Sequence, residues 1–482
     1  MERADIAIIG TGPGGVSAAL TAKVRNKNIL LIGKKQMSDK VSKAHQIMNY
    51  PGLPAVTGAD MAKAFEKQLA MMEINITDSR IGTVYAMGDY FAIQAGGEVL
   101  EAKSVILACG VVSGKTLPGE EEMLGRGVSY CATCDACFYK GKKVLVTGHT
   151  GFKGSWLCRI LFKAGAEVTG YSLVPPTEPN LFSMIDVEDK MNSVIGDIRD
   201  LEHLKKVFEE TQPEIVLHLA AQPIVRESYK DPVYTYETNV MGTVNICECV
   251  RLNPCVKSFL NVTTDKVYHN NEWAWGYREN EPLDGYDPYS NSKSCSELVT
   301  HSYINSFFND MEVAVSTARA GNVIGGGDFA NDRIVPDCVR AAVKKEDIIV
   351  RNPHSTRPYQ HVLEPLAAYL MIAKEQYSDK KYAGFYNVGP DESDCITTGT
   401  LVDTFCNKWG EGLSWINKYD GGPHEANFLK LDCSKLKTTF GWKPRWNFDT
   451  AIEKSVEWSK VYAANGDVVK CMDMQIDEFF AE

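Results

Sequence analysis

The stretch KKVLVTGHTGFKGSWLCRILFKAGAEVTGYSL, residues 142–173, decides the fold of the larger part of the chain. An apolar run leads into Gly148, Gly151 and Gly154, spaced G-x-x-G-x-x-G, and a helical pattern and a second apolar run follow. In such a strand–turn–helix unit a pyrophosphate group can lie against the amino end of the helix. The stretch therefore predicts the first β-α-β unit of a nucleotide-binding Rossmann sheet.

Strands and helices alternate with short connections after residue 143, which is the pattern of an α/β, doubly wound parallel sheet. Helices are predicted between the strands, including Val233–Arg251 and Tyr289–Phe307. The alternation loosens after residue 320, so we expect a Rossmann part of about 143–320 and a smaller substrate-binding part, mostly 321–482. The predicted strands are Lys143–Thr147, Glu167–Tyr171, Ser193–Gly196, Glu214–Leu219, Ser258–Thr263 and Val313–Ala318.

A second glycine-rich turn between an apolar run and a helical pattern occurs near the start of the chain. In ADIAIIGTGPGGVSAAL, residues 4–20, Gly10, Gly12 and Gly15 fit the spacing G-x-G-x-x-G. This spacing predicts a partial, FAD-binding Rossmann-like segment over residues 1–142. The boundary with the second part, 143–482, is expected in the short lysine-rich stretch Tyr139–Lys143.

Composition restricts the class of protein. The chain has 482 residues, 44% of them hydrophobic, and a net charge of −11, which argues against general binding to nucleic acid. No apolar run is long enough for a membrane span, and the first residues lack a cleavable signal pattern. The 14 cysteines stand at irregular spacings, as expected of reduced thiols. We therefore expect a cytoplasmic protein that binds neither nucleic acid nor membranes.

Small and acidic residues follow the predicted strands where a cofactor would lie. Asp197 and Ile198 come after the third strand in GDIRD, where a carboxylate can reach an adenine amino group. Ala220 and Ala221 follow the fourth strand and let a cofactor approach the backbone. With Phe152 and the glycines of the first turn, these residues predict a dinucleotide cradle.

A threonine, a tyrosine and a lysine supply the candidate chemistry. Thr264 ends the fifth strand, and Tyr289 and Lys293 stand four residues apart in YSNSK, on one face of a helix. A lysine near a tyrosine favours the phenolate and lowers the tyrosine pKa, which makes an acid/base group. Tyr-x-x-x-Lys also occurs by chance as an exposed helix pair. Its position after the fifth strand of this sheet favours the functional interpretation.

Residues 143–482 resemble the extended short-chain dehydrogenase/reductases, and among them the CDP-glucose 4,6-dehydratases. The pair Asp265-Lys266 favours the CDP-glucose enzymes within this family, because the related dTDP-glucose enzymes have Asp-Glu at these positions. The stretches that carry it are TGHTGFKGSWL, PPTEPNLF, GDIRD, HLAAQPIVRESY, NVMGTVN, TTDKVY, YSNSK, ARAGNVIGGGDF, RPYQHVLE and QIDEFF.

The resemblance implies a redox-neutral elimination of water from CDP-glucose, with bound NAD. It implies that Tyr289 takes the proton of the sugar 4-hydroxyl, that Lys266 removes the C5 proton and that Asp265 protonates the departing 6-hydroxyl. The division of the last two roles between Asp265 and Lys266 stays open. The second predicted strand ends without the acidic residue that usually holds the adenosine ribose, so NAD rests on the resemblance alone.

The resemblance further implies a clamp for the sugar diphosphate, formed by Asn322, Arg333 and Arg357. The rigid fork of arginine suits phosphate oxygens. An ordinary surface ion pair is an equal alternative for Arg333, whereas Arg357 within RPYQHV is the stronger candidate. Members of the family commonly form homodimers through helices of the Rossmann half.

Residues 1–143 resemble the amino-terminal part of the low-molecular-weight thioredoxin reductases. GTGPGG, NYPG, VILACG, LPGE and YCATCDACFYKGKKV carry this resemblance, which places Cys131 and Cys134 at a redox disulfide beside FAD. A flavin-dependent thiol–disulfide oxidoreductase is therefore the alternative function, and a non-catalytic NAD-binding protein is a third. The second part of the family's flavin domain has no counterpart that we recognise, so we expect weak flavin binding. Zinc at Cys131, Cys134 and Cys137 lacks a fourth ligand, and no metal is expected.

Overall fold

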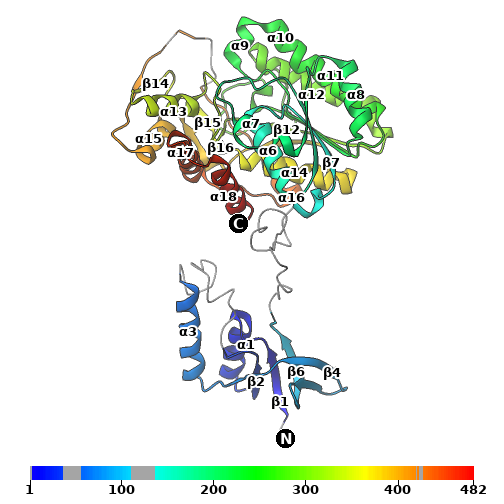
Figure 1. The fold of residues 1–482 in the computed structure, drawn as a ribbon, viewed down its shortest axis with the longest axis vertical. Coiled ribbons are helices and arrows are strands. Elements are labelled where there is room, and N and C mark those ends of the chain that lie inside the picture. Colours follow the sequence, from blue (N-terminus) through cyan, green and yellow to red (C-terminus); the bar gives the residue numbers. More distant parts are fainter. Residues whose placement is uncertain (1–2, 36–55, 110–135, 420, 423–426, 482) are drawn as a thin grey trace. The chain divides into compact units, whose positions relative to one another are not determined.

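The structure is a computed structural model that describes residues 3–35, 56–109, 136–419, 421–422 and 427–481. The chain divides into two units, Met1–Pro118 and Gly119–Glu482. Figure 1 shows a sheet flanked by helices in each unit.

A seven-stranded sheet organises the larger unit, in the order β17-β12-β11-β10-β7-β8-β9, and every neighbouring pair is parallel. The strand order reverses between β7 and β10, and ligands of such sheets bind at the carboxyl ends beside this reversal. The doubly wound parallel sheet predicted from sequence is thus confirmed. The strands are β7 (Lys143–Thr147), β8 (Glu167–Ser172), β9 (Asn192–Ile195), β10 (Ile215–His218), β11 (Ser258–Thr263), β12 (Ala314–Ala320) and β17 (Phe385–Val388).

Alternating side chains send the two faces of this sheet into different cores. Val144 and Val146 of β7 pack on one face, with α6 (Phe152–Lys163) and α14 (Leu363–Ser378). Leu145 packs on the other face, with α8 (Leu201–Thr211) and α11 (Gly242–Leu252). Both faces are covered, as a parallel sheet requires.

The helix predicted at Val233–Arg251 consists of three pieces: α10 (Pro232–Tyr236), a π-helical segment Glu237–Met241 and α11. The helix predicted at Tyr289–Phe307 is α12 (Pro288–Ser306). The turn that links β11 to the following loop is η3 (Asp265–Val267).

The region after residue 320 adds a third core around α13 (Ile334–Lys344), α15 (Thr398–Trp409) and α17 (Phe448–Ala463). However, β17 joins the Rossmann sheet and α14 covers it, so the two parts interleave along the chain. The further α-helices and strands after residue 143 are α7 (Leu181–Met184), α9 (Val225–Lys230), α16 (Ser434–Phe440), α18 (Val468–Ala481), β13 (Val323–Ile324), β14 (Ile348–Val350), β15 (Thr356–Pro358), β16 (Gln360–His361), β18 (Cys395–Thr397) and β19 (Trp415–Asn417).

The smaller unit has a six-stranded sheet in the order β3-β2-β1-β6-β5-β4. The strands from β3 to β6 pair in parallel, and β6, β5 and β4 form an antiparallel meander. This is the predicted Rossmann-like segment. Its elements are β1 (Ala4–Ile9), α1 (Pro13–Val24), β2 (Ile29–Ile32), α3 (Gly58–Met71), β3 (Ile76–Thr77), β4 (Ile81–Ala86), β5 (Phe91–Ala95) and β6 (Glu98–Leu107).

Within the described residues, no helix has the length and apolar character needed to cross a membrane. The same residues contain no group of three or more His, Cys, Asp or Glu side chains arranged to hold a metal ion.

Candidate active site

The glycine-rich turn between β7 and α6 packs too closely against neighbouring backbone to accept a side chain at Gly148 or Gly154. A Cβ atom on Gly148, whose φ is +76°, would lie 2.8 Å from the backbone nitrogen of Ala220. A Cβ on Gly154 would lie 2.1 Å from the carbonyl oxygen of Gly148. Thr147 Oγ1 accepts hydrogen bonds of 3.2 Å from the backbone N–H groups of Leu219 and Ala220, which joins the ends of β7 and β10. This tight turn at a helix amino end fits a dinucleotide pyrophosphate.

The residues predicted to bind adenosine lie nearby, at the ends of β8 and β9. The carboxylate of Asp197 accepts hydrogen bonds from Arg199, whose guanidinium lowers the pKa of that carboxyl. Ile198 is buried against Gly242. At the end of β8, where an acidic residue is missing, the hydroxyls of Thr150 and Ser172 lie 2.9 Å apart.

The carboxylate of Asp265 is buried and held from several sides. Thr264 Oγ1 donates to Oδ1 at 2.9 Å, and Asn322 Nδ2 donates to Oδ2 at 3.1 Å. Gly321 packs so closely that a Cβ there would lie 2.0 Å from the carboxyl carbon of Asp265. Asn322 was predicted to contact substrate, and the structure shows its side-chain amide on Asp265. Lys266 follows in the same turn, with its backbone N–H 3.5 Å from Thr264 Oγ1.

Tyr289 and Lys293 lie on successive turns of α12, and burial governs both of their pKa values. Burial raises the pKa of Tyr289 to about 12, against a hydrogen bond with Thr264 that lowers it. The predicted lowering of the Tyr289 pKa is therefore wrong for this structure, because desolvation of the phenolate outweighs that hydrogen bond. Burial and nearby Lys153 lower the pKa of Lys293 to about 7, against the carboxylate of Glu297. Lys293 Nζ donates to the carbonyl oxygen of Val262 at 3.2 Å.

Lys153 is a candidate residue that the sequence reasoning missed. It follows Phe152 at the start of α6, and burial together with Arg333 lowers its pKa to about 8. The carboxylates of Asp265 and Asp328 act in the opposite direction, so Lys153 lies within electrostatic reach of the site. A charged residue inside the glycine-rich turn was the signal that could have revealed it.

The two predicted arginines differ in their surroundings. Arg333 Nη1 donates to Asp328 Oδ2 at 2.9 Å, and its positive charge also acts on the pKa of Tyr289. Arg333 therefore forms an ion pair beside the site. Arg357 lies on β15 with 5% of its surface exposed, and its Nη1 donates to the carbonyl oxygen of Thr356.

The turn after β1 in the smaller unit is equally tight. A Cβ on Gly10, with φ of +119°, would lie 2.1 Å from the carbonyl oxygen of Ala108, and one on Gly15 would lie 1.8 Å from that of Gly10. Gly12 caps the amino end of α1. This backbone fits a close-lying phosphate, as predicted for FAD. Cys131 and Cys134 lie outside the described residues.

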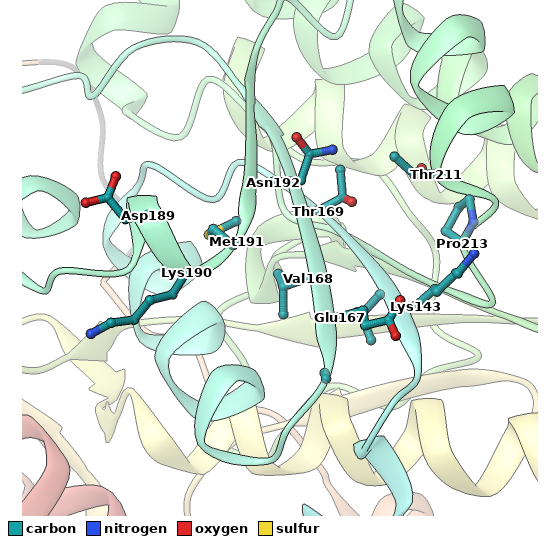
Figure 2. A pocket seen from close by; sticks show the side chains of 12 residues that line it. Lys143, Glu167, Val168, Thr169, Asp189, Lys190, Met191, Asn192, Thr211 and Pro213 are labelled. Carbon is teal, nitrogen blue, oxygen red and sulfur yellow. The ribbon is translucent and has the colours of Figure 1, made fainter. Parts of the chain in front are cut away.

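A cavity of about 540 Å³ lies at the opposite end of the sheet (Figure 2). Lys143, Glu167 and Asn192, the first residues of β7, β8 and β9, line it. The candidate catalytic side chains stand at the carboxyl ends of strands, so this cavity is not part of their site.

The parallel sheet, its glycine-rich turn and the Thr-Tyr-Lys group define a nucleotide-binding Rossmann enzyme of the short-chain dehydrogenase/reductase type. The family model described as GDP-mannose 4,6 dehydratase matches residues 145–455, and the chain belongs to this family. It is 48% identical to the CDP-glucose 4,6-dehydratase of Salmonella typhimurium over 353 residues, which are 72% of this chain and 98% of that relative. A probable dTDP-glucose 4,6-dehydratase of Sinorhizobium fredii is 30% identical over 345 residues, 67% of this chain and 93% of the relative. The family resemblance of the larger part is thus confirmed.

Solved structures show the same fold. The Thermus thermophilus UDP-glucose 4-epimerase complex with NAD matches with a TM-score of 0.59 and 25% identity, covering 66% of this chain and 98% of that one. The dTDP-glucose 4,6-dehydratase of Bacillus anthracis in complex with NAD matches with a TM-score of 0.57 and 21% identity, covering 68% and 100%.

The amino-terminal part matches a different family. The pyridine nucleotide-disulphide oxidoreductase model covers residues 4–191. The thioredoxin reductase of Bacillus subtilis is 35% identical over 155 residues, which are 30% of this chain and 46% of that relative. The chain therefore spans about half the length of this relative, and the second resemblance is confirmed for that part.

Proposed function

We propose that residues 143–482 form a lyase that converts CDP-D-glucose to CDP-4-dehydro-6-deoxy-D-glucose and water. The observation that carries the proposal is the Asp265-Lys266 turn at the carboxyl end of β11, in which Asp265 is buried, with Thr264 beside it and Tyr289 and Lys293 on α12. Identity of 48% to a CDP-glucose 4,6-dehydratase along nearly its whole length supports the choice of nucleotide.

The cofactor of this reaction is NAD, and the turn after β7 fits its pyrophosphate. When bound, NAD supplies a transient oxidant that accepts a hydride from C4 of the sugar and returns it to C6. The residues proposed to hold NAD are Gly148, Gly151, Phe152, Gly154, Asp197, Ile198, Ala220, Ala221, Tyr289 and Lys293.

The chain's own side chains move the protons. Tyr289 takes the proton of the 4-hydroxyl, and Thr264 lies beside the same oxygen. Thr264 also acts to lower the pKa of Tyr289, toward the phenolate that this step needs. Lys266 removes the C5 proton, which the neighbouring C4 carbonyl has made acidic, and gives a proton back to C5 when the hydride reaches C6. Asp265 gives a proton to the departing 6-hydroxyl, which leaves as water. The hydrogen bonds to Thr264 and Asn322 fix the direction of the Asp265 carboxyl group.

The sugar diphosphate is the proposed ligand of Asn322, Arg333 and Arg357. Arg333 is charged and close enough to influence Tyr289, so its guanidinium can turn from Asp328 to a phosphate oxygen. Arg357 is buried on β15, and the hydrogen bond from its Nη1 to the carbonyl oxygen of Thr356 orients its guanidinium.

For residues 1–142 we propose a partial FAD-binding segment, with Cys131 and Cys134 as its redox disulfide. The tight turns at Gly10 and Gly15 and the match to a thioredoxin reductase favour this second function. A yellow colour and a flavin absorption spectrum after purification would support it, and a colourless protein that gains no absorption when mixed with FAD would refute it. We also propose that the chain is a cytoplasmic homodimer. Sedimentation of the whole chain would test the dimer.

The decisive experiment incubates the purified chain with NAD and, in separate reactions, CDP-glucose, dTDP-glucose or GDP-mannose, without a reductant. Mass spectrometry should show loss of one water from CDP-glucose alone, and Tyr289→Phe should abolish this loss. A folded chain that binds NAD and dehydrates none of the three substrates would refute the proposal.

A further inference from the structure

An ion pair lies directly beneath the candidate active site and has no part in the chemistry proposed above. Glu297 of α12 and Arg319 of β12 are joined by a bond of 2.9 Å between Arg319 Nη2 and Glu297 Oε2. Their side chains are only 1% and 3% exposed. The carboxylate raises the pKa of Arg319 despite burial, so the guanidinium keeps its charge. Hydrogen bonds to both charged groups hold a buried pair of this kind rigidly, although Arg319 Nε has no partner among the described residues.

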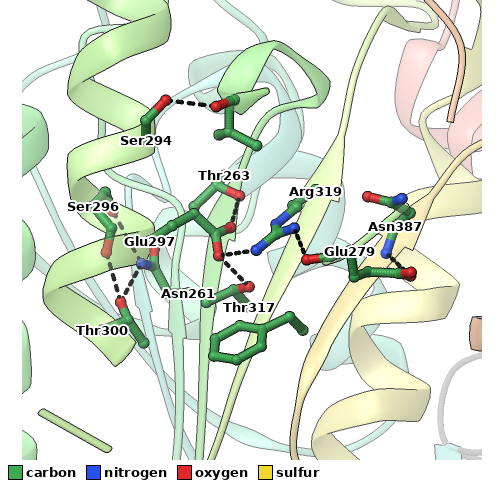
Figure 3. A network of polar contacts seen from close by, with 12 residues as sticks. Asn261, Thr263, Glu279, Ser294, Ser296, Glu297, Thr300, Thr317, Arg319 and Asn387 are labelled. Carbon is green, nitrogen blue, oxygen red and sulfur yellow. Dashed lines mark hydrogen bonds and ion pairs between the residues drawn. The ribbon is translucent and has the colours of Figure 1, made fainter. Parts of the chain in front are cut away.

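Glu297 ties together the elements that carry the reacting groups (Figure 3). Thr263 is the last residue of β11, and its Oγ1 donates to Glu297 Oε1 at 2.5 Å. Thr317 of β12 donates through its Oγ1 to Glu297 Oε2 at 2.8 Å. Glu297 stands four residues after Lys293 on α12, which places both on one face of the helix. One carboxylate therefore holds the catalytic helix against the strand that leads into Thr264 and Asp265.

Arg319 reaches the other end of the same turn. Its Nη1 donates to the hydroxyl of Tyr268 at 2.8 Å, and Tyr268 follows the η3 turn directly. The Tyr268 hydroxyl donates in turn to Asn387 Oδ1 at 2.6 Å, which fixes it to β17. The residues immediately before and after Thr264–Val267 are thus both bound to one ion pair.

We propose that Glu297 and Arg319 are positioning residues that hold the Thr264–Val267 turn, and with it Asp265 and Lys266, in the geometry needed to eliminate water. This inference rests on the proposed function. Tyr289 shares α12 with Glu297, but of the two threonines bound to Glu297 only Thr263 adjoins the turn, so loss of its hydroxyl should act on the turn first. Loss of the pair should impair the departure of the 6-hydroxyl more than the binding of substrate.

Thr263→Val and Thr317→Val form a matched pair of variants. Each removes one buried hydroxyl that donates to Glu297, but only Thr263 precedes the turn. For Thr263→Val we expect kcat with CDP-glucose to fall about tenfold, with KM changed less than about twofold, because a small misplacement of reacting groups is costly. For Thr317→Val we expect kcat within about threefold of the wild type.

A fluorinated substrate identifies the step affected. In CDP-6-deoxy-6-fluoro-D-glucose, fluoride leaves in place of hydroxide and depends less on protonation by Asp265. The defect of Thr263→Val should therefore shrink to less than about threefold with this substrate. An equal defect with both substrates would overturn the proposal, since it would show a general structural effect, and so would equal activities of the two threonine variants.

Glu297→Gln tests the pair itself, with Asp473→Asn as its control. Asp473 forms a similar ion pair with Arg159, bonded at 2.9 Å, between α18 and α6. Both variants should lower the melting temperature, but only Glu297→Gln should lower kcat, by about 100-fold, with partial recovery on the fluorinated substrate. If Glu297→Gln does not fold, the two threonine variants test the proposal instead, together with Tyr268→Phe, which removes the hydroxyl bound to Arg319. A wild-type chain that fails to dehydrate CDP-glucose would overturn the proposed function and this inference together. An active wild type whose variants keep the wild-type kcat would overturn this inference alone.

Discussion

Gly321→Ala should disable the proposed acid, Asp265, without replacing any reacting group. The new Cβ would lie 2.0 Å from the carboxyl carbon of Asp265 and 2.0 and 2.2 Å from its two oxygens. Ordinary contacts begin near 3.4 Å, so the carboxylate must move by about 1.4 Å, the difference between 3.4 and 2.0 Å. This movement breaks its hydrogen bonds with Thr264 and Asn322, which are 2.9 and 3.1 Å long. A displacement of ~1 Å costs a reaction on the order of 100-fold, so kcat should fall by about that factor.

The assay measures kcat by quantifying the dehydrated nucleotide sugar, together with the melting temperature and the NAD affinity of each variant. Gly384→Ala is the control, because a Cβ there would meet its nearest atom, Lys435 Nζ, at an ordinary 3.4 Å. Gly321→Ala should keep its NAD affinity within about threefold, since Asp265 is not one of the cradle residues. Activity of Gly321→Ala within about threefold of the control would refute the assignment of Asp265 as a positioned acid.

Three further predictions follow from burial and hydrogen bonding. Lys293 has a pKa of about 7 in the folded chain against an ordinary 10.5, so this side chain binds more protons in the unfolded chain between these values. Its contribution to stability should rise with pH across that window, by at most about 1.4 kcal/mol per unit, and Lys293→Met should make the slope of stability against pH less positive in urea titrations. Lys153, with a pKa of about 8, contributes in the same direction and stays in the variant. Thr264→Val should raise the pKa of Tyr289 further and lower kcat about tenfold near neutral pH, and an unchanged pH–rate profile would contradict this. Trp156 is fully buried and its Nε1 donates to the carbonyl oxygen of Gly326 at 3.0 Å, so Trp156→Ala should cost ~3–5 kcal/mol of unfolding free energy, measured by denaturant titration.

The sequence predicted the larger sheet well because each central strand is a short apolar run bounded by a glycine-rich turn or an acidic loop. Lys143–Thr147 and Ser258–Thr263 were predicted to the residue. The seventh strand, Phe385–Val388, was not predicted, because four residues are too few to give a periodic signal. The π-helical segment Glu237–Met241 inside a predicted single helix was also invisible, since the hydrophobic pattern continues through it.

The site was predictable where residues are neighbours along the chain and unpredictable where distant segments meet. The spacing of Tyr289 and Lys293 on one helix follows from sequence alone. That Asn322 binds Asp265, 57 positions away, depends on how β11 and β12 pair. The direction of the Tyr289 pKa depends on burial, which spacing does not reveal, and this is why the predicted lowering was wrong.

The two family matches overlap between residues 145 and 191, and the structure gives a physical reason. Both families place a nucleotide-binding strand, glycine turn and helix at this point, so one β-α-β unit satisfies both patterns. Residues just before that strand are built into the larger unit. Tyr139 donates its hydroxyl proton to the carbonyl oxygen of Leu370 at 2.7 Å. Lys142 Nζ lies 3.0 Å from Glu214 Oε1 and 2.9 Å from the hydroxyl of Tyr377. The overlap therefore falls on a unit that fits both family patterns, and the dehydratase sheet has its first strand and the contacts that anchor its start.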